Sequence, residues 1–285
     1  MLPQVDDTGS PDRPARHTEL GSFGRVCRLG LATRGNTFLD IQDVLSAVDR
    51  GVNYLNWCGH ADGMSRAVRS MSDSARRRVF VAVQLGARDA TGAARELEAY
   101  LGELGTSYID VVTYYYVEHK DEWQSIISRG GAAEAVEQAR ADGRVRAIGL
   151  TSHQRPLAAT LAASGRLDLL MIRYNAAHRG AEQDIFPLTR SRKMPVVAFT
   201  VLRWGALMKP TPEDPAYFVP PGAPQWVRFV LGRPDVTVAL MAPNGRTELE
   251  QNLALLDDWR ALTADEDAAL RAHGDRVRRR GGAFP

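Results

Sequence analysis

The sequence is poor in cysteine and has no long apolar run. Its 285 residues include only Cys27 and Cys58, too few for the disulfide framework of a small secreted domain or for a cysteine-rich metal site. No apolar stretch approaches the roughly 20 residues that a membrane-spanning helix needs. The N-terminal stretch carries Pro, Asp and Ser and lacks the charged and then apolar pattern of a signal peptide. We therefore expect residues 1–20 to form a mobile extension and the protein to be cytoplasmic.

The sequence also lacks an excess of charge of either sign. It has 36 basic and 34 acidic residues and a formal net charge of +2, so bulk charge indicates no polyanionic partner. The most basic stretch, Arg276–Arg280, lies in the last predicted helix and is interpreted as a solvated face. Neither nucleic acid nor a membrane is expected as a partner. With 44% hydrophobic and 25% charged residues, the composition is that of a globular protein.

What the sequence does contain is an alternation of short β-rich runs with longer helical patterns. Apolar residues recur at helical spacing over residues 38–48, before Gly51. Near the end of the chain, Thr263 and Glu266 form a capping box for a final helix. The eight β-rich runs are Cys27–Ala32, Val52–Trp57, Val79–Leu85, Tyr108–Tyr114, Val145–Thr151, Leu167–Tyr174, Pro195–Thr200 and Val236–Met241.

This alternation predicts an α/β protein with a parallel sheet, and eight units predict closure into a single (β/α)₈ TIM barrel with an extra C-terminal helix. An open doubly wound sheet is the alternative, disfavoured because no GxGxxG follows the first predicted strand. No linker interrupts the chain, so residues 21–285 are expected to form one barrel domain. The proline-rich stretch 209–224 is expected to form a rim over the functional end of the barrel.

Eight segments, in order and spacing, carry a resemblance to a known family. They are LGLATRGNT (29–37), RGVNYLNWC (50–58), RRRVFVAVQLG (76–86), LGTSYIDVVTYYY (104–116), GRVRAIGLTSH (143–153), RYNAAHR (173–179), PVVAFTVLRWG (195–205) and FVLGRPDVTVALMAPNGRTELEQNL (229–253). Together they resemble the aldo/keto reductases. The resemblance implies a barrel with its active site at the C-terminal ends of the strands, where loops deliver functional side chains.

In that family an Asp, a Tyr, a Lys and a His carry the proton chemistry. The corresponding positions here are Asn56, Ala61, Gln84 and Tyr115, so all four residues differ. The two amides can hydrogen-bond one another, but neither can shift the pKa of a phenol by charge. A one-residue slip would bring His60 or Asp62 to the Tyr position, and Tyr115 could act as an acid from the opposite side. The candidate catalytic residues are thus Asn56, His60, Gln84 and Tyr115.

Some of the positions that hold a nicotinamide dinucleotide in the family keep a suitable residue here, and others do not. Its stacking aromatic corresponds to Phe199, which keeps a π face, and an adenine contact corresponds to Asn252. Where the family binds a 2′-phosphate only Arg246 supplies positive charge, and Glu248 would repel the phosphate. NADP or NAD is therefore a possible but doubtful cofactor. The candidate cofactor-binding residues are Thr151, Ser152, Phe199, Arg246 and Asn252, whereas Met171 replaces a family Gln that holds the carboxamide.

Other polar and aromatic side chains follow the predicted strands and are candidates for binding a small polar or anionic substrate. Arginine suits this task because its planar guanidinium can pair with a carboxylate or phosphate through two hydrogen bonds. No histidine pair has a metal-ligand spacing such as HxxxH, so no metal is expected. The candidate substrate-binding residues are Trp57, His119, His153, Arg173 and Arg203.

Three functions remain open. The first is an aldo/keto reductase-like enzyme with a redirected, non-standard active site that acts on a small polar or anionic metabolite. The second is an NAD(P)-dependent oxidoreductase with an unusual proton donor, His60 or Tyr115. The third is a non-catalytic binding or regulatory protein on the same scaffold. The sequence predicts no particular substrate and no oligomeric state.

Overall fold

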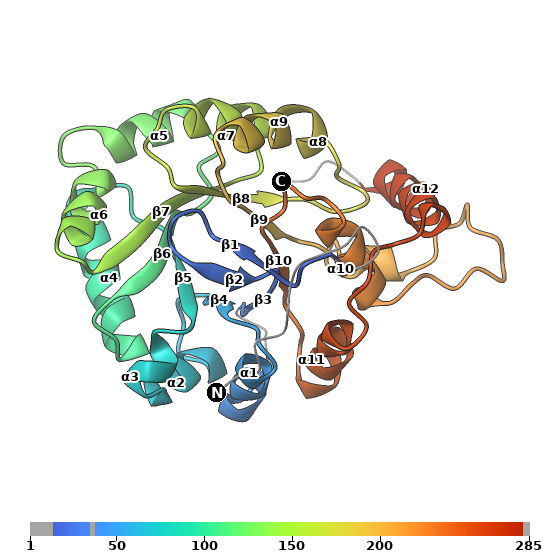
Figure 1. The fold of residues 1–285 in the computed structure, drawn as a ribbon. Coiled ribbons are helices and arrows are strands. Elements are labelled where there is room, and N and C mark those ends of the chain that lie inside the picture. The colour runs from blue at the N-terminus through green and yellow to red at the C-terminus, as the bar shows by residue number, and fades with distance from the viewer. Residues whose placement is uncertain (1–13, 35–37, 282–285) are drawn as a thin grey trace.

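A computed structural model of the chain describes residues 14–34 and 38–281 and has a closed barrel of eight parallel strands at its centre (Figure 1). Neighbouring strands pair in chain order, and the last pairs with the first to close the barrel. The prediction of a (β/α)₈ barrel is confirmed, and each β-rich run matches one barrel strand to within two residues at either end. These strands are β3 (Leu29–Ala32), β4 (Tyr54–Asn56), β5 (Phe80–Leu85), β6 (Ile109–Tyr114), β7 (Val145–Ser152), β8 (Leu169–Arg173), β9 (Val196–Phe199) and β10 (Val238–Met241).

Helices surround the barrel, and their starts and stops follow local chemistry. The helix predicted near residues 38–48 begins after an Asp40 capping box, and the final helix begins after the Thr263–Glu266 capping box, as expected. The α-helices are α1 (Ile41–Asp49), α2 (Gly63–Ser70), α3 (Asp73–Arg76), α4 (Ala90–Leu104), α5 (Lys120–Ile127), α6 (Ala132–Ala141), α7 (Arg155–Ala162), α8 (Ala181–Asp184), α9 (Phe186–Ser191), α10 (Ala223–Leu231), α11 (Arg246–Leu253) and α12 (Ala264–Arg280). Short 3₁₀ turns follow at η1 (Ala206–Met208) and η2 (Ala254–Leu256).

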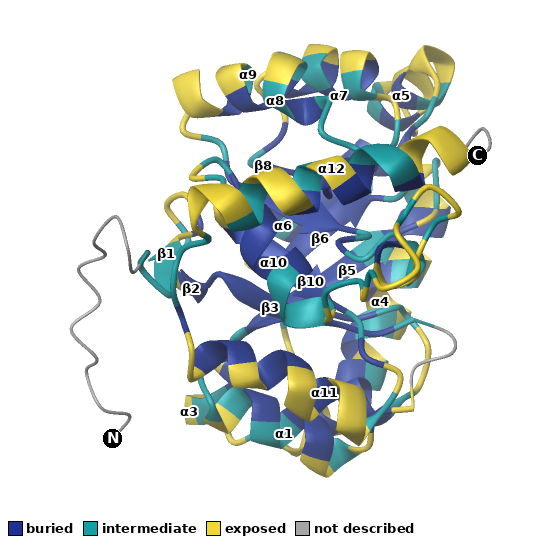
Figure 2. Ribbon diagram, turned by 90° about the vertical axis from the view of Figure 1, so that its right-hand side faces the viewer, coloured by how far each residue is buried: buried dark blue, intermediate teal, exposed yellow. Residues whose placement is uncertain are grey.

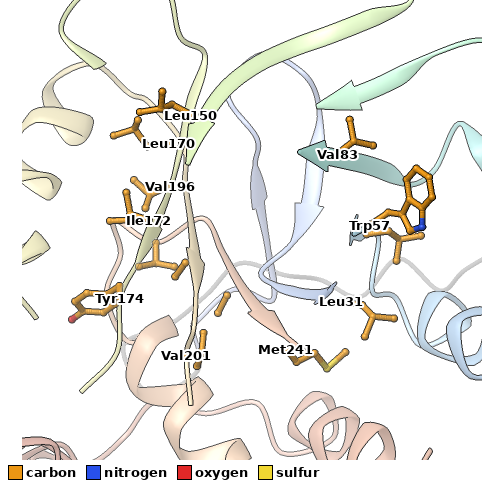
Figure 3. Packing of buried hydrophobic residues seen from close by; sticks show 14 of the residues in the cluster. Leu31, Trp57, Val83, Leu150, Leu170, Ile172, Tyr174, Val196, Val201 and Met241 are labelled. Atoms are coloured by element: carbon orange, nitrogen blue, oxygen red, sulfur yellow. The ribbon is translucent and has the colours of Figure 1, made fainter. Parts of the chain in front are cut away.

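Two apolar layers hold the barrel together. Alternate strand residues face opposite sides of a sheet, so one set fills the barrel interior and the other packs under the helices. Figure 3 shows part of the outer layer, which includes Trp57 and Val83. Figure 2 shows the result, a buried barrel whose surrounding helices expose only their outer faces. At the barrel mouth, side chains at alternate positions of a strand therefore face the interior, and those between them face the helices.

A short antiparallel hairpin closes the N-terminal end of the barrel. Strands β1 (His17–Glu19) and β2 (Arg25–Cys27) pair with each other, and Leu20 and Val26 are fully buried in the interior cluster. Residues 17–20, which were expected to belong to the mobile extension, are thus part of this hairpin, whose apolar side chains plug the barrel. Residues 1–13 of the expected extension lie outside the described residues.

The proline-rich stretch does not form the expected rim, because a buried carboxylate ties it to α12. Asp214 is 1% exposed, accepts a hydrogen bond from the Thr211 hydroxyl at 2.8 Å and pairs with Arg276 at 2.6 Å. It also lies 3.4 Å from the His273 ring. Burial acts to raise the pKa of Asp214, but hydrogen bonds from Thr211 and His273 outweigh it and lower the pKa to about 2. The stretch therefore packs beside α12.

A second buried carboxylate links three strands near the N-terminal end. Asp110, on β6, is 1% exposed, accepts a hydrogen bond from the Val81 amide of β5 at 2.9 Å and pairs with Arg146 of β7 at 2.7 Å. It also pairs with the buried Arg76 at 2.8 Å. A buried ion pair need not stabilise a fold on balance, but losing one member leaves a buried charge without compensation.

Asp110→Ala should therefore lower the free energy of unfolding by about 3–5 kcal/mol. Asp142→Ala removes an exposed carboxylate at the end of α6 and should change it by less than about 0.5 kcal/mol. Urea unfolding of the three proteins measures both effects. Equal stability of the two variants would show that the Asp110 network is not structurally important.

Candidate active-site groove

A cavity of about 420 Å³ and a second of about 360 Å³ lie at the functional side of the molecule; the smaller one opens directly at the C-terminal ends of the barrel strands. We call this smaller cavity the mouth groove. Its walls come from the ends of β3, β4, β5, β6, β8, β9 and β10 and from the loops that follow them. The lining residues are Ala32, Thr33, Arg34, Asn56, Gln84, Tyr115, Tyr116, Met171, Phe199, Thr200, Val201, Leu202, Trp204, Gly205, Met208, Leu240, Ala242, Asn244 and Glu248.

Three of the four candidate catalytic residues line this groove. Asn56 and Gln84 each stand two residues after a residue that faces the barrel interior, and Tyr115 continues the same alternation beyond β6. All three side chains therefore face the barrel axis and line the groove. The Gln84 amide donates to the Met171 sulfur at 3.8 Å. The Asn56 side-chain oxygen is buried and has no hydrogen-bond partner among residues 14–34 and 38–281. A buried orphan acceptor is costly, so this oxygen is suited to receive a donor from a ligand.

Three other predicted site residues do not line the groove. Trp57 is 1% exposed, donates from its indole nitrogen to the His60 carbonyl oxygen at 2.9 Å and packs edge-on against Tyr100. It follows Asn56 directly and so faces the helix layer (Figure 3). His60 and His119 are exposed on loops outside the groove. The prediction of substrate contacts by Trp57 is wrong because its position in the strand points it outward.

A pair of stacked tyrosines forms one wall of the groove. The rings of Tyr115 and Tyr116 lie 4.0 Å apart, centroid to centroid, at an angle of 22°. Burial, together with the adjacent Tyr115 hydroxyl, raises the pKa of Tyr116 well above its usual value. Tyr116 therefore stays a neutral hydrogen-bond donor at physiological pH. The sequence did not predict this position in the groove, because no sequence pattern indicates the left-handed backbone of Tyr116, whose φ is 44°.

Backbone strain gathers on the same rim. Besides Tyr116, the non-glycine residues Thr200, Arg203 and Trp204 have φ between 48° and 55°. All three follow β9, and Thr200 and Trp204 line the groove. A left-handed conformation costs non-glycine residues free energy, of order 1–3 kcal/mol each. Such outliers are typical of functional loops, and here they shape the wall beside Phe199.

His153 lies behind the groove wall and forms a pair with Glu118. The His153 Nδ1 lies 3.4 Å from the Glu118 carboxylate, and its ring contacts Tyr116 and Phe199 at centroid distances of 4.5 and 5.5 Å. Nε2 is buried with no hydrogen-bond partner in the described part of the chain. Burial lowers the pKa of His153 despite the opposing effect of Glu118. His153 thus supports the two aromatic walls and is neutral at pH 7.

The predicted cofactor positions divide into two groups. Phe199 lines the groove. Thr151 pairs with Met171 of the neighbouring strand, and its buried hydroxyl oxygen has no hydrogen-bond partner among the described residues. Asn252 is 4% exposed, and its side-chain oxygen likewise finds no partner there. In contrast, the Ser152 hydroxyl faces away from the groove and accepts from the Gln154 amide at 3.0 Å.

The end of the groove that would receive a 2′-phosphate carries a carboxylate, Glu248, as well as the guanidinium of Arg34, which donates to the Asn244 side chain at 2.9 Å. Arg246 is held by Asp43 at 2.7 Å and does not line the groove. Glu248 does line it and accepts a hydrogen bond from the Asn244 amide at 2.8 Å. A carboxylate at this place repels a phosphate dianion but accepts hydrogen bonds from ribose hydroxyls.

The predicted anion clamps lie beside the groove and do not line it. Burial together with the neighbouring Arg155 and Arg203 lowers the pKa of Arg173. Burial and the charges of Arg173, Arg203, Arg278 and Arg155 lower the pKa of His178, five residues further along the chain, to about 4. Positive charge is thus concentrated on the flank of the mouth. Among the described residues no group of three or more His, Cys, Asp or Glu side chains could hold a metal ion, and no helix there is long and apolar enough to cross a membrane.

The free energy of unfolding should fall as the pH is lowered from 7 to 5. Folded His178 has a pKa of about 4, whereas an unfolded histidine titrates near ~6.5. Between these values the unfolded chain takes up a proton that the folded chain excludes, so acid favours unfolding. His178→Asn should reduce this loss by on the order of 1 kcal/mol at pH 5. Urea unfolding at both pH values tests this, and equal losses in the two proteins would contradict it.

Comparisons with known proteins agree with this geometry. The aldo/keto reductase family profile matches residues 33–221. An NADH-specific methylglyoxal reductase of Escherichia coli is 27% identical over 132 residues, which cover 45% of this chain and only 37% of that protein. An aldo-keto reductase of Bacillus halodurans, in its holo form, superposes with a TM-score of 0.71 over 92% of this chain and 96% of that chain, at 18% identity. The chain therefore belongs to the aldo/keto reductase family of oxidoreductases.

Proposed function

We propose that this protein is an NADH-linked oxidoreductase with a redirected proton-transfer site, acting on a small polar or anionic carbonyl metabolite in the cytoplasm. The observation that carries the proposal is the continuity of the mouth groove. One cavity joins Asn56, Gln84 and Tyr115 to the Phe199 ring and to Glu248. A cofactor position and a proton-transfer position thus share one solvent-accessible space.

The residues present suit a nicotinamide dinucleotide without a 2′-phosphate. Phe199 offers a face for the nicotinamide ring, and the orphaned oxygens of Thr151 and Asn252 are unmet acceptors at positions that contact the carboxamide and the adenine in the family. When bound, the dinucleotide would supply the reducing equivalent for a carbonyl group. Glu248 favours NADH over NADPH, in keeping with the name of the Escherichia coli relative.

Tyr115 is the group best placed to give a proton to the substrate oxygen. It lines the groove at the end of the strand next to that of Gln84, whereas His60, the other candidate donor, is exposed outside it. The two amides can orient the carbonyl by hydrogen bonds. Tyr116 supports the Tyr115 ring by stacking. Because no lysine stands beside the phenol, the step should be slower than a charge-assisted one.

Titration of the protein with NADH and NADPH, followed by fluorescence, tests the cofactor. NADH should bind at least about tenfold more tightly than NADPH, and Glu248→Gln should narrow this ratio because it removes a repulsive charge. Phe199→Ala should weaken NADH binding about fivefold, the loss of one stacking contact. Tyr217→Ala serves as the control, since Tyr217 is 86% exposed outside the groove. No binding of either dinucleotide at millimolar concentration would contradict the proposal.

NADH oxidation with a panel of small aldehydes and keto acids tests the reaction. Tyr115→Phe should lower kcat by about 10²–10⁴-fold, as expected for loss of a general acid, and leave NADH affinity nearly unchanged. His60→Gln is the matched control and should keep full activity. A wild-type protein that binds NADH but reduces no carbonyl would instead favour the non-catalytic binding function.

A further inference from the structure

A cavity on the flank of the barrel mouth lies between the start of α7, the α8 segment and the C-terminal half of α12. It has a volume of about 420 Å³ and shares no lining residue with the mouth groove. We call it the basic pocket. Its lining residues are Arg155, Arg179, Gly180, Glu182, Gln183, Arg271 and Arg278.

Four guanidinium groups and one carboxylate line this pocket. Arg155 pairs with Asp184 at 2.9 Å and Arg179 with Asp275 at 2.8 Å. Arg271 pairs with Asp267 at 2.7 Å and with Glu182, which also lines the pocket, at 3.4 Å. Arg278 is exposed and forms no ion pair with any residue of the described chain. The lining itself carries four guanidinium groups against one carboxylate.

A glycine opens the pocket to one of these cations. A β-carbon at residue 180 would collide with the Arg155 guanidinium carbon and both of its terminal nitrogens. The backbone of Gly180, with φ of −58° and ψ of −24°, suits any residue, so the conformation does not require glycine there. The absent side chain instead lets Arg155 lie across Gly180.

The positive charge of the pocket acts on neighbouring ionisable groups. Burial and four cations, among them Arg155 and Arg278, lower the pKa of His178 to about 4. Arg155 also acts to lower the pKa of the half-buried Arg173. Like charges held together in this way are stabilised by a bound counter-ion.

We propose that the basic pocket is a binding site, separate from the mouth groove, for a small polyanion that carries phosphate groups. A phosphate group carries about −1.5 to −2 charge at pH 7 and accepts paired hydrogen bonds from arginine. The volume lies within the roughly 300–1,000 Å³ typical of small-molecule sites, and is large enough for two linked phosphate groups. The proposal holds whether or not the groove binds NADH.

Calorimetric titration with pyrophosphate, in chloride buffer, tests the site. The affinity should fall at least about fivefold in Arg278→Gln, which removes one cation, and in Gly180→Ala, which displaces the Arg155 side chain but keeps its charge. Arg77→Gln removes an exposed arginine beside α3 and should bind pyrophosphate as the wild type does. Equal affinity in all four proteins would overturn the proposal, as would tighter binding of citrate than of pyrophosphate.

Two further readouts separate this pocket from the groove. Saturating NADH should leave pyrophosphate binding intact, whereas its displacement by NADH would place the anion in the groove and overturn the proposal. In the unmodified protein, bound pyrophosphate should raise the pKa of His178, followed by NMR of the imidazole, because an anion favours the charged ring. An unchanged His178 titration at saturating pyrophosphate would also overturn it.

Discussion

The pairing of β10 with β3 is the constraint on which the rest of the structure depends. Because this pair closes a barrel of parallel strands, every strand ends at the same rim, and side chains far apart in the sequence meet there. Closure also gives each strand an inside and an outside, with a period of two residues. Asn56, Gln84 and Tyr115 share the groove for this reason, although 59 residues separate the first from the last. The interior below them is filled by apolar side chains, so a ligand of the barrel itself binds at its mouth and not along its axis.

The strand positions could be predicted from the sequence, and so could the outward direction of Trp57. Strand positions followed from short apolar runs between helical patterns, and all eight are present. Applied to each run, the same alternation would have separated Asn56 from its neighbour Trp57, since adjacent residues of a strand face opposite sides. Trp57 is accordingly buried under the helices. The directions of the His60 and His119 side chains could not be predicted in this way, because both residues lie in loops, which have no regular alternation of side chains.

Other features depend on contacts that no local pattern encodes. Arg246 was expected to face a phosphate, but Asp43, 203 residues earlier in the chain, holds it at 2.7 Å. The hairpin that plugs the barrel is two three-residue strands, too short for periodicity to reveal. The basic pocket is assembled from a helix start, a loop and the last helix. The sequence shows how many charged residues these segments contain, but it does not show which of them lie next to one another in the fold.

The substitutions at the mouth are consistent with one another in physical terms. In the family an aspartate pairs with a lysine, and losing only one of them would leave a buried charge without a partner, a change that costs about 3–5 kcal/mol. Here both positions carry amides, Asn56 and Gln84, so the site is neutral and needs no counter-charge. Burial raises the pKa of Tyr116 more than Arg173 lowers it, so Tyr116 stays protonated. Positive charge instead lies on the flank, around Arg155 and Arg173. For the reaction proposed above, an uncharged pair of amides beside a positive flank would suit a carbonyl substrate whose reacting end is uncharged and whose other end is anionic.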